Sequence, residues 1–323
     1  MLRYMLRRAI ETALLLILLS FLIYGLIGLM PGDPIDLMIA SDPAVTAADA
    51  VRLKALHGLD RPLVERYLDW VSRAFSGEFG YSRLYGLPVL EVLWPRLLNT
   101  LALMGASLVL ALALALPAGI TAARRPGGVV DGVVNLVAFA GISVPSFWLG
   151  LLLIILFAVE LGWLPAGGVT SVGGGDLPDR LRYMVLPVLT LTILSAGTFL
   201  RFVRSAMIET LREDYVRTAR AKGCSPDRVV WRHALRNALI PIVTIVALSF
   251  GAVFSGALVV ETLFAYLGMG KLIYDAILGN DYNLALVALM LAAAVTLAAN
   301  MAADLLYVWL DPRITLDGPG RAP

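Results

Sequence analysis

Six long stretches of this chain contain no Asp, Glu, Lys or Arg, and they constrain the fold more than any other feature. They cover residues 12–32, 97–123, 132–159, 183–200, 237–260 and 282–303. A helix needs about 20 apolar residues to cross the hydrocarbon core of a bilayer, whereas membrane β-strands alternate apolar and polar residues over about 10 positions. The pattern therefore predicts an all-α polytopic membrane protein with six transmembrane helices.

Composition agrees with this prediction and excludes several kinds of chemistry. The chain is 59% hydrophobic and 15% charged, against about 25% charged residues in an average soluble domain. A net charge of +2 gives no reason to expect a nucleic-acid partner. One cysteine, Cys224, and two histidines far apart in sequence, His57 and His233, predict neither a disulfide framework nor a metal site.

The basic residues predict how the chain is threaded through the bilayer. Sixteen Lys and Arg fall on the side that holds both termini and the loops 124–131 and 201–236, and three fall on the opposite short loops. Cytoplasmic loops carry the excess of Lys and Arg. Both termini are therefore expected in the cytoplasm, and segment 33–96 on the outer side. That segment is predicted to be a helical cap on the membrane helices, a docking surface for a partner, or a wall of the entry path.

The chain shows no energy source of its own. Ion-coupled pumps keep acids, bases or His inside the bilayer, and the six stretches have none. Four acids at the ends of spans, among them Glu261, are expected to reach the membrane interface. The nearest approach to a phosphate loop, around Gly268, lacks the first glycine and the Ser or Thr that must reach magnesium. The chain is therefore predicted to be no enzyme by itself, and to be a passive channel or a transporter driven by partner subunits.

The loop 201–236 is the most informative part of the sequence. It contains nine Lys and Arg and four acids, a net charge of +5. Gly223 is placed to end a first helix in a left-handed conformation, while Ser225, Pro226 and Asp227 are typical of the first positions of a second helix. The loop is predicted to form a helix–glycine–helix knob that suits a groove on a soluble partner.

Polar residues inside the spans are the candidates for the translocation path. Pro145 falls inside the third stretch, where it is expected to kink the helix and to free backbone carbonyls that neighbouring hydroxyls can satisfy. A purely structural kink and simple interhelical hydrogen bonding explain these residues equally well. The path candidates are Ser143, Pro145, Ser146, Thr198 and Ser249.

Several motifs resemble one family. They are Leu29-Met30-Pro31-Gly32-Asp33-Pro34, Ser143-Val144-Pro145-Ser146-Phe147-Trp148, Asp214-Tyr215-Val216-Arg217-Thr218-Ala219-Arg220-Ala221-Lys222-Gly223 and Arg232-His233-Ala234-Leu235-Arg236-Asn237-Ala238-Leu239-Ile240-Pro241. Over nearly its whole length the chain is similar to a type I ABC importer permease, the first membrane subunit of the dipeptide/oligopeptide/nickel importers. The wider superfamily has Glu-Ala-Ala where this chain has Arg217-Thr218-Ala219, a departure usual in the peptide branch.

The resemblance implies a domain organisation with a MetI-like permease core. Residues 1–32 would be an extra N-terminal transmembrane helix, 33–96 a small extracytoplasmic helical domain, and 311–323 a cytoplasmic tail. The core would be residues 97–310, with spans at about 97–123, 132–160, 183–203, 237–260 and 282–305 and a cytoplasmic coupling segment at residues 204–236.

The resemblance also implies the partners. They are a second homologous permease, two ATP-binding subunits that hold ATP and magnesium, an extracytoplasmic solute-binding protein and the lipid of the inner membrane. Within the coupling segment the residues expected to serve the ATPase are Asp214, Tyr215, Arg217, Thr218, Ala219, Arg220, Lys222, Gly223, Ser225 and His233. Peptides are the expected cargo. Nickel chelates, glutathione and oligosaccharides stay open as cargo, and a passive channel or a membrane scaffold stays open as a function.

Overall fold

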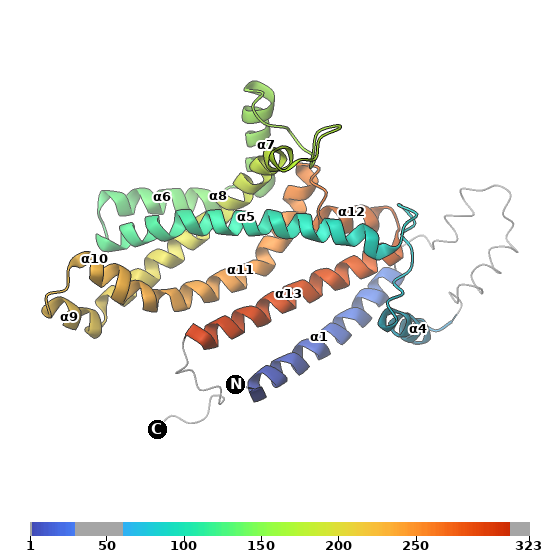
Figure 1. Ribbon diagram of the computed structural model, residues 1–323, viewed down its shortest axis with the longest axis horizontal. Coiled ribbons are helices and arrows are strands. Elements are labelled where there is room, and N and C mark those ends of the chain that lie inside the picture. The colour runs from blue at the N-terminus through green and yellow to red at the C-terminus, as the bar shows by residue number, and fades with distance from the viewer. Residues whose placement is uncertain (1, 30–60, 311–323) are drawn as a thin grey trace, which may run out of the picture. The chain divides into compact units, whose positions relative to one another are not determined.

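The computed structural model describes residues 2–29 and 61–310 of the chain; the side chains of residues 2–5, 247–256 and 303–310 lie outside the description. Residues 33–60 of the predicted outer domain and the tail 311–323 therefore lie outside the described residues. Every regular element in the described ranges is a helix (Figure 1). The helices are α1 (Leu2–Gly28), α4 (Leu63–Phe75), α5 (Val89–Arg124), α6 (Val129–Ser143), α7 (Ser146–Leu153), a π-helix η1 (Ile154–Glu160), α8 (Leu177–Arg212), α9 (Asp214–Ala221), α10 (Pro226–Arg228), a π-helix η2 (Val229–Ala234), α11 (Leu235–Leu263), α12 (Met269–Leu278) and α13 (Tyr282–Leu310).

The membrane spans agree with the sequence pattern. Within the described residues five helices are long and apolar enough to cross a bilayer, and a bent pair of helices makes a sixth span if it is counted as one. The five are the apolar parts of α1, α5, α8, the α10–α11 helix and α13. The uncharged stretches therefore predicted the positions of the spans, but the helices extend beyond them. For example, α8 runs from Leu177 to Arg212, whereas the predicted span is 183–203.

The third predicted span is broken rather than kinked. Val144 is extended, with φ −87° and ψ 126°, and it separates α6 from α7, whose axes differ by 101°. Proline disfavours helical backbone in the residue before it, and its ring cannot supply the N–H that would continue α6. Pro145 then precedes the first turn of α7, where a missing N–H has no cost. The expected kink at Pro145 is therefore a full change of direction.

The chain forms two compact units. The first contains residues 1–98 and 271–295, and the second contains residues 99–270 and 296–323. In the first unit the carboxylate of Asp281 is buried and accepts hydrogen bonds from Ser82 Oγ at 2.5 Å, Leu84 N at 3.0 Å and Leu284 N at 3.2 Å. One side chain thus caps the start of α13 and fixes the loop that precedes α5.

In the second unit α8 is the central helix, and both α6 and α11 pack against it. Two glycines let α6 and α8 approach closely, since a Cβ on Gly141 would lie 2.9 Å from the carbonyl oxygen of Ile193, and one on Gly197 would lie 2.7 Å from that of Ala138. Small residues at such crossings are typical of helix packing in membranes. Phe199 and Leu200 on α8 fill the neighbouring core against Ala111 and Ala115 of α5.

Candidate functional site

The coupling segment begins within α8 and turns sharply at Glu213. The sequence predicted one helix up to Gly223, but α8 ends at Arg212, and Glu213 is extended, with φ −64° and ψ 148°. A separate short helix, α9, then covers Asp214–Ala221. The extended residue separates α9 from α8, so α9 is held by its own contacts. Figure 1 shows α9 and α10 together at one end of α8.

Gly223 ends α9 as the sequence predicted. Its φ is +80°, its N–H donates to the carbonyl oxygen of Arg220 at 2.9 Å, and the N–H of Cys224 donates to that of Ala219 at 3.2 Å. This pair of bonds is the Schellman motif, which satisfies the last carbonyls of a helix and requires a left-handed residue. A Cβ at Gly223 would meet no atom within 4 Å, so only the backbone conformation calls for glycine here.

The second helix of the coupling segment starts at Ser225. Its Oγ accepts the N–H of Arg228 at 3.4 Å, and Pro226 occupies the first helical position, as predicted. The helix then runs without interruption through η2 into α11. The π-helical stretch Val229–Ala234 has no signal that the sequence analysis recognised.

One side of α9 faces its own chain. Val216, Ala219 and Val229 form a buried cluster to which Leu211 and Cys224 add contacts. Val216 is fully buried and Ala219 is 7% exposed. Ala219 is among the residues predicted to serve a partner, but its methyl group packs inside the segment, because an isolated helix as short as α9 needs apolar contacts to stay folded.

The other side of α9 is exposed and mostly charged. Arg217 donates to Asp214 at 3.3 Å, and Thr218 Oγ1 donates to the carbonyl oxygen of Asp214 at 3.0 Å. Gly223 and Ser225 are exposed at the turn, and His233 is half-buried on η2. The predicted coupling residues that lie exposed on α9 and its cap are Asp214, Tyr215, Arg217, Thr218, Arg220 and Lys222.

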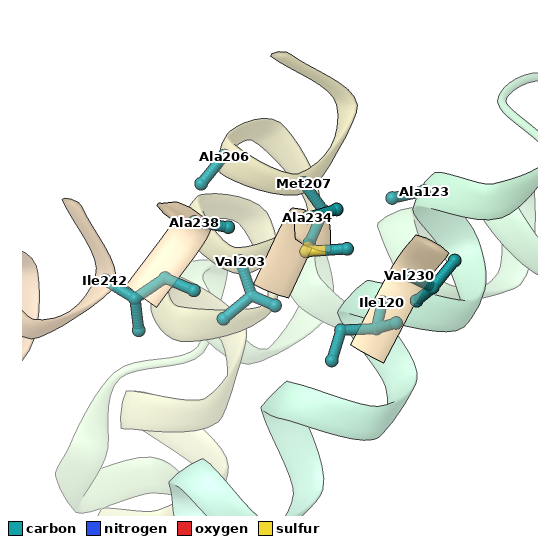
Figure 2. Packing of buried hydrophobic residues seen from close by; sticks show 9 residues of the cluster. All are labelled: Ile120, Ala123, Val203, Ala206, Met207, Val230, Ala234, Ala238 and Ile242. Carbon is teal, nitrogen blue, oxygen red and sulfur yellow. The ribbon is translucent and has the colours of Figure 1, made fainter. Parts of the chain in front are cut away.

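An apolar cluster joins the coupling segment to the membrane helices. Figure 2 shows how α5, α8, η2 and α11 each contribute side chains to it. Met207, Val203 and Ala234 are fully buried there. The cluster consists of Ile120, Ala123, Val203, Ala206, Met207, Val230, Ala234, Ala238 and Ile242. The cluster therefore fixes η2 to the three long helices, and α9 is joined to η2 through the separate cluster of Val216, Ala219 and Val229.

Two ion pairs reinforce this connection. Arg124 at the end of α5 donates to the carboxylate of Asp227, which stands on the helix after Ser225. Arg204 on α8 pairs with Asp131 on α6, and its Nη2 lies 2.8 Å from Asp131 Oδ2. The N–H of Gly127 also donates to Asp131, at 2.8 Å. The connection between α5 and α6 thus has an ion pair at each end, Arg124 with Asp227 and Asp131 with Arg204.

The comparisons with known proteins agree with this geometry. Residues 115–316 match the family described as "Binding-protein-dependent transport system inner membrane component", and residues 1–103 match "Binding-prot-dependent transport system membrane comp, N-term". The first match covers more than half of the chain. The chain belongs to this family of ABC importer permeases. The resemblance seen in the sequence motifs is confirmed.

Two relatives align with the permease over nearly all of its length. The "Oligopeptide transport system permease protein AppB" of Bacillus subtilis is 37% identical over 96% of this chain and 98% of its own. The "Di/tripeptide transport system permease protein DppB" of Pseudomonas aeruginosa is 40% identical over 91% of this chain and 93% of its own. Among solved structures, the MetNI methionine ABC transporter in inward facing conformations has a TM-score of 0.55 at 20% identity, covering 69% of this chain and 98% of that one. That likeness shows the fold: the permease has the type I importer core.

The path candidates of the permease lie on different elements. Ser143, Pro145 and Ser146 meet at the break between α6 and α7, where Ser143 and Pro145 are exposed and Ser146 is half-buried. Thr198 is half-buried on α8. Ser249 belongs to α11, and its side chain lies outside the described residues. The break thus presents three of the five candidates together.

Glu261 does not reach the membrane interface, contrary to what its place at the end of a span predicts. It is fully buried, and it accepts a hydrogen bond from Thr100 Oγ1 at 2.5 Å. Thr100 Oγ1 in turn accepts the N–H of Met269 at 2.7 Å, so the acid fixes the loop that follows α11. A Cβ on Gly268 would lie 2.2 Å from the carboxyl carbon of Glu261. Gly268, which lies in the stretch that resembles an incomplete phosphate loop, thus leaves room for the carboxylate of Glu261.

Asp131 and Arg204 were also missed as functional candidates. Asp131 stands just before the uncharged stretch 132–159, and the structure includes it in the first turn of α6, where it is buried. Nothing in the sequence around Asp131 predicts that it pairs with Arg204, 73 residues later. Within the described ranges no group of three or more His, Cys, Asp and Glu side chains could hold a metal ion.

Proposed function

We propose that this permease is one of two membrane subunits of an ATP-driven importer for di- or oligopeptides, and that α9 couples it to an ATP-hydrolysing subunit. The observation that carries the proposal is the two-sided packing of α9. Its apolar side is buried in its own chain with Val216 and Ala219, while six polar and aromatic residues stand exposed on this short helix and its C-cap. Such a helix can move as a rigid body when the ATPase subunit bound to it moves.

The charge and shape of α9 suit a groove on a soluble protein. The segment 201–236 carries nine basic and four acidic residues. Fixed arginines at the rim of an interface speed association and set register more than they add affinity. The shape set by Gly223 and the buried cluster, rather than any single charge, therefore determines the fit.

ATP supplies the driving force in this proposal, and partner chains hold it with magnesium. ATP binding favours a closed pair of ATPase subunits, and ATP contributes different contacts in the open and closed states. Closure would move each α9 with the core of Figure 2, turning the path between inward- and outward-facing arrangements by rigid-body rotation. A solute-binding protein would deliver the cargo to the outer face.

The threading proposed for the permease places the termini and the coupling segment in the cytoplasm. The Arg124–Asp227 ion pair supports one part of this assignment, since it brings the α5–α6 connection and the coupling segment to the same end of their unit. Both are among the loops rich in Arg and Lys.

The peptide cargo rests on the relatives. AppB is named for oligopeptide transport and DppB for di- and tripeptide transport, and they align over 96% and 91% of the permease. The break at Ser143, Pro145 and Ser146 is the proposed lining of the path, because an interrupted helix exposes backbone groups that can bind an amide.

The test is reconstitution of the permease with its partner permease, its ATPase subunits and its binding protein in liposomes. We expect uptake of a labelled peptide only with ATP and loaded binding protein present, and no ATPase activity from the permease alone. Flux through the permease without the ATPases would establish a passive channel. No flux under any condition, with binding of a soluble complex retained, would establish a scaffold.

A further inference from the structure

The helix α4 has one continuous apolar side, although it follows the membrane span α1 in a segment rich in charge. Leu63, Tyr67, Trp70 and Ala74 lie three and four positions apart, and so do Val64, Leu68, Val71 and Phe75. At about 100° per residue these two rows are neighbours on the helix surface. Every charged residue of α4 lies outside both rows.

The first row packs against α1. Tyr67 is 8% exposed, and its hydroxyl lies 2.6 Å from Ser20 Oγ. Its ring contacts Phe21 and Tyr24 edge-on, with centroids 5.2 and 5.7 Å away, and Trp70 lies against Tyr24 at 6.1 Å. This hydrogen bond satisfies the hydroxyl groups of Ser20 and Tyr67 where few water molecules are available.

These contacts fix the depth of α4. Apart from a long hydrogen bond of 3.5 Å from the Tyr67 hydroxyl to the carbonyl oxygen of Ile17, they fall between Ser20 and Gly28, the last nine residues of the α1 span Leu6–Gly28. At 1.5 Å per residue Ser20 lies about 12 Å from the end of the span, within a hydrocarbon core about 30 Å thick. The helix α4 therefore lies beside a segment that is itself in the bilayer.

Three of the four side chains in the second row are exposed, while Val71 is half-buried. Val64 is 54% exposed, Leu68 58% and Phe75 90%. On α1, which is long and apolar enough to span a bilayer, Leu18, Leu22 and Leu26 are exposed as well. The exposed apolar side chains of α4 therefore stand on a helix packed against a span that also exposes apolar side chains.

The opposite side of α4 is polar and exposed. Arg61 and Asp69 form an exposed ion pair at 3.1 Å, and Glu65 and Arg73 are exposed. The helix holds two acids and two bases, so its net charge gives it no preference for anionic lipid. Tyr and Trp are enriched at membrane–water interfaces, and the first row of α4 contains one of each, Tyr67 and Trp70.

We propose that α4 is an interfacial membrane helix, with Val64, Leu68, Val71 and Phe75 buried in the leaflet at the C-terminal end of α1. The partner is a lipid surface rather than a protein. Interfacial helices bury one apolar face about 5–10 Å into the boundary between headgroups and acyl chains. The assignment gives the predicted outer domain an anchor in the membrane and does not depend on which cargo the permease carries.

The test uses nitroxide labels on the assembled transporter in nanodiscs of phosphatidylcholine. The Cys224→Ser variant removes the only thiol, and single cysteines then replace Leu68, Phe75 and, as matched controls on the polar side, Glu65 and Ser72. We expect oxygen, which concentrates in lipid, to relax the labels at 68 and 75 more strongly than a water-soluble nickel chelate does. The order should reverse at 65 and 72.

Two outcomes would overturn the proposal. Strong relaxation by the nickel chelate at 68 and 75 would show that the row faces water. Weak relaxation by both reagents would show that protein covers it, whether residues 30–60, the second permease or the binding protein. A second measurement needs no substitution: a photoactivatable acyl-chain lipid should attach to the peptides that contain Leu68 and Phe75 in the unaltered chain, and absence of such adducts would also contradict the assignment.

Discussion

Arg204 on α8 holds the buried carboxylate of Asp131 on α6 through two hydrogen bonds, although the two residues are 73 positions apart. Asp131 is 3% exposed and also accepts bonds from Gly127 and Asn135. The pair fixes two helices at the end of the unit that carries the coupling segment. A rigid connection there is what a helix that transmits motion requires.

The first prediction concerns this pair. Removing one partner of a buried ion pair costs about 3–5 kcal/mol because the other charge stays buried, and the cost here should lie at the lower end since Arg204 is partly exposed. Arg204→Ala should lower the unfolding temperature of the purified permease by several degrees. Arg217→Ala, at an exposed pair worth about 0–1 kcal/mol, is the control. Equal effects of the two variants would show that the buried pair does not hold the fold.

The second prediction concerns Gly223. Its left-handed conformation costs a branched residue roughly 1–2 kcal/mol, whereas Asn adopts it more readily. Gly223→Val should leave membrane insertion near normal and abolish peptide uptake and the stimulation of ATPase activity by loaded binding protein. Gly223→Asn should keep most of both, because a side chain meets no atom there. If Gly223→Val transported fully while Arg217→Ala did not, charge rather than shape would carry the coupling.

Ala219 gives the third prediction, since it is buried against Val229 in its own chain. Ala219→Ser should be tolerated, while Ala219→Trp should loosen the coupling segment even in the isolated permease, because overpacking a core costs about 1–3 kcal/mol. Limited proteolysis without any ATPase present measures this. Thr218→Trp, at the exposed neighbouring position, is the control and should leave the cleavage rate unchanged. Faster cleavage of the control alone would contradict the observed orientation of α9.

The fourth prediction concerns the buried Glu261. Gly268→Ala would place a methyl group against its carboxyl group and should displace the hydrogen bond from Thr100. Gly105→Ala is the matched control, because a Cβ on Gly105 in α5 meets nothing within 4 Å. Gly268→Ala and Thr100→Val should each lower the unfolding temperature, and together they should do so by less than the sum, since they act on one contact. Simple additivity would mean that the two changes act separately.

The fifth prediction tests the threading. Cys224, the only thiol, should react with a membrane-impermeant maleimide in inside-out vesicles and not in spheroplasts. Because Cys224 is half-buried, Thr218→Cys in a Cys224→Ser background provides an exposed reporter on the same segment. Labelling of both from the outer face would reverse the orientation and remove the basis for an ATPase contact at α9.

The amino-acid sequence by itself determined the features that depend on neighbouring residues. Uncharged stretches located the spans, because the bilayer penalises a charge wherever the rest of the chain lies. Gly223 and Ser225–Pro226 located the end of one helix and the start of the next, because caps are satisfied within a few residues. The family followed from the same local motifs.

Only the tertiary structure decided what depends on residues far apart. Glu261 is buried because Thr100, 161 positions earlier, supplies its hydrogen bond, and nothing near position 261 indicates this partner. The inward face of Ala219 depends on Val229 across the turn at Gly223. The 101° change of direction at Pro145 likewise exceeds the expected kink, since proline only ends one helix while the packing of α7 against α8 and α11 sets the course of the next. Hydrophobicity and backbone preference act locally, whereas burial and pairing are properties of the packed chain.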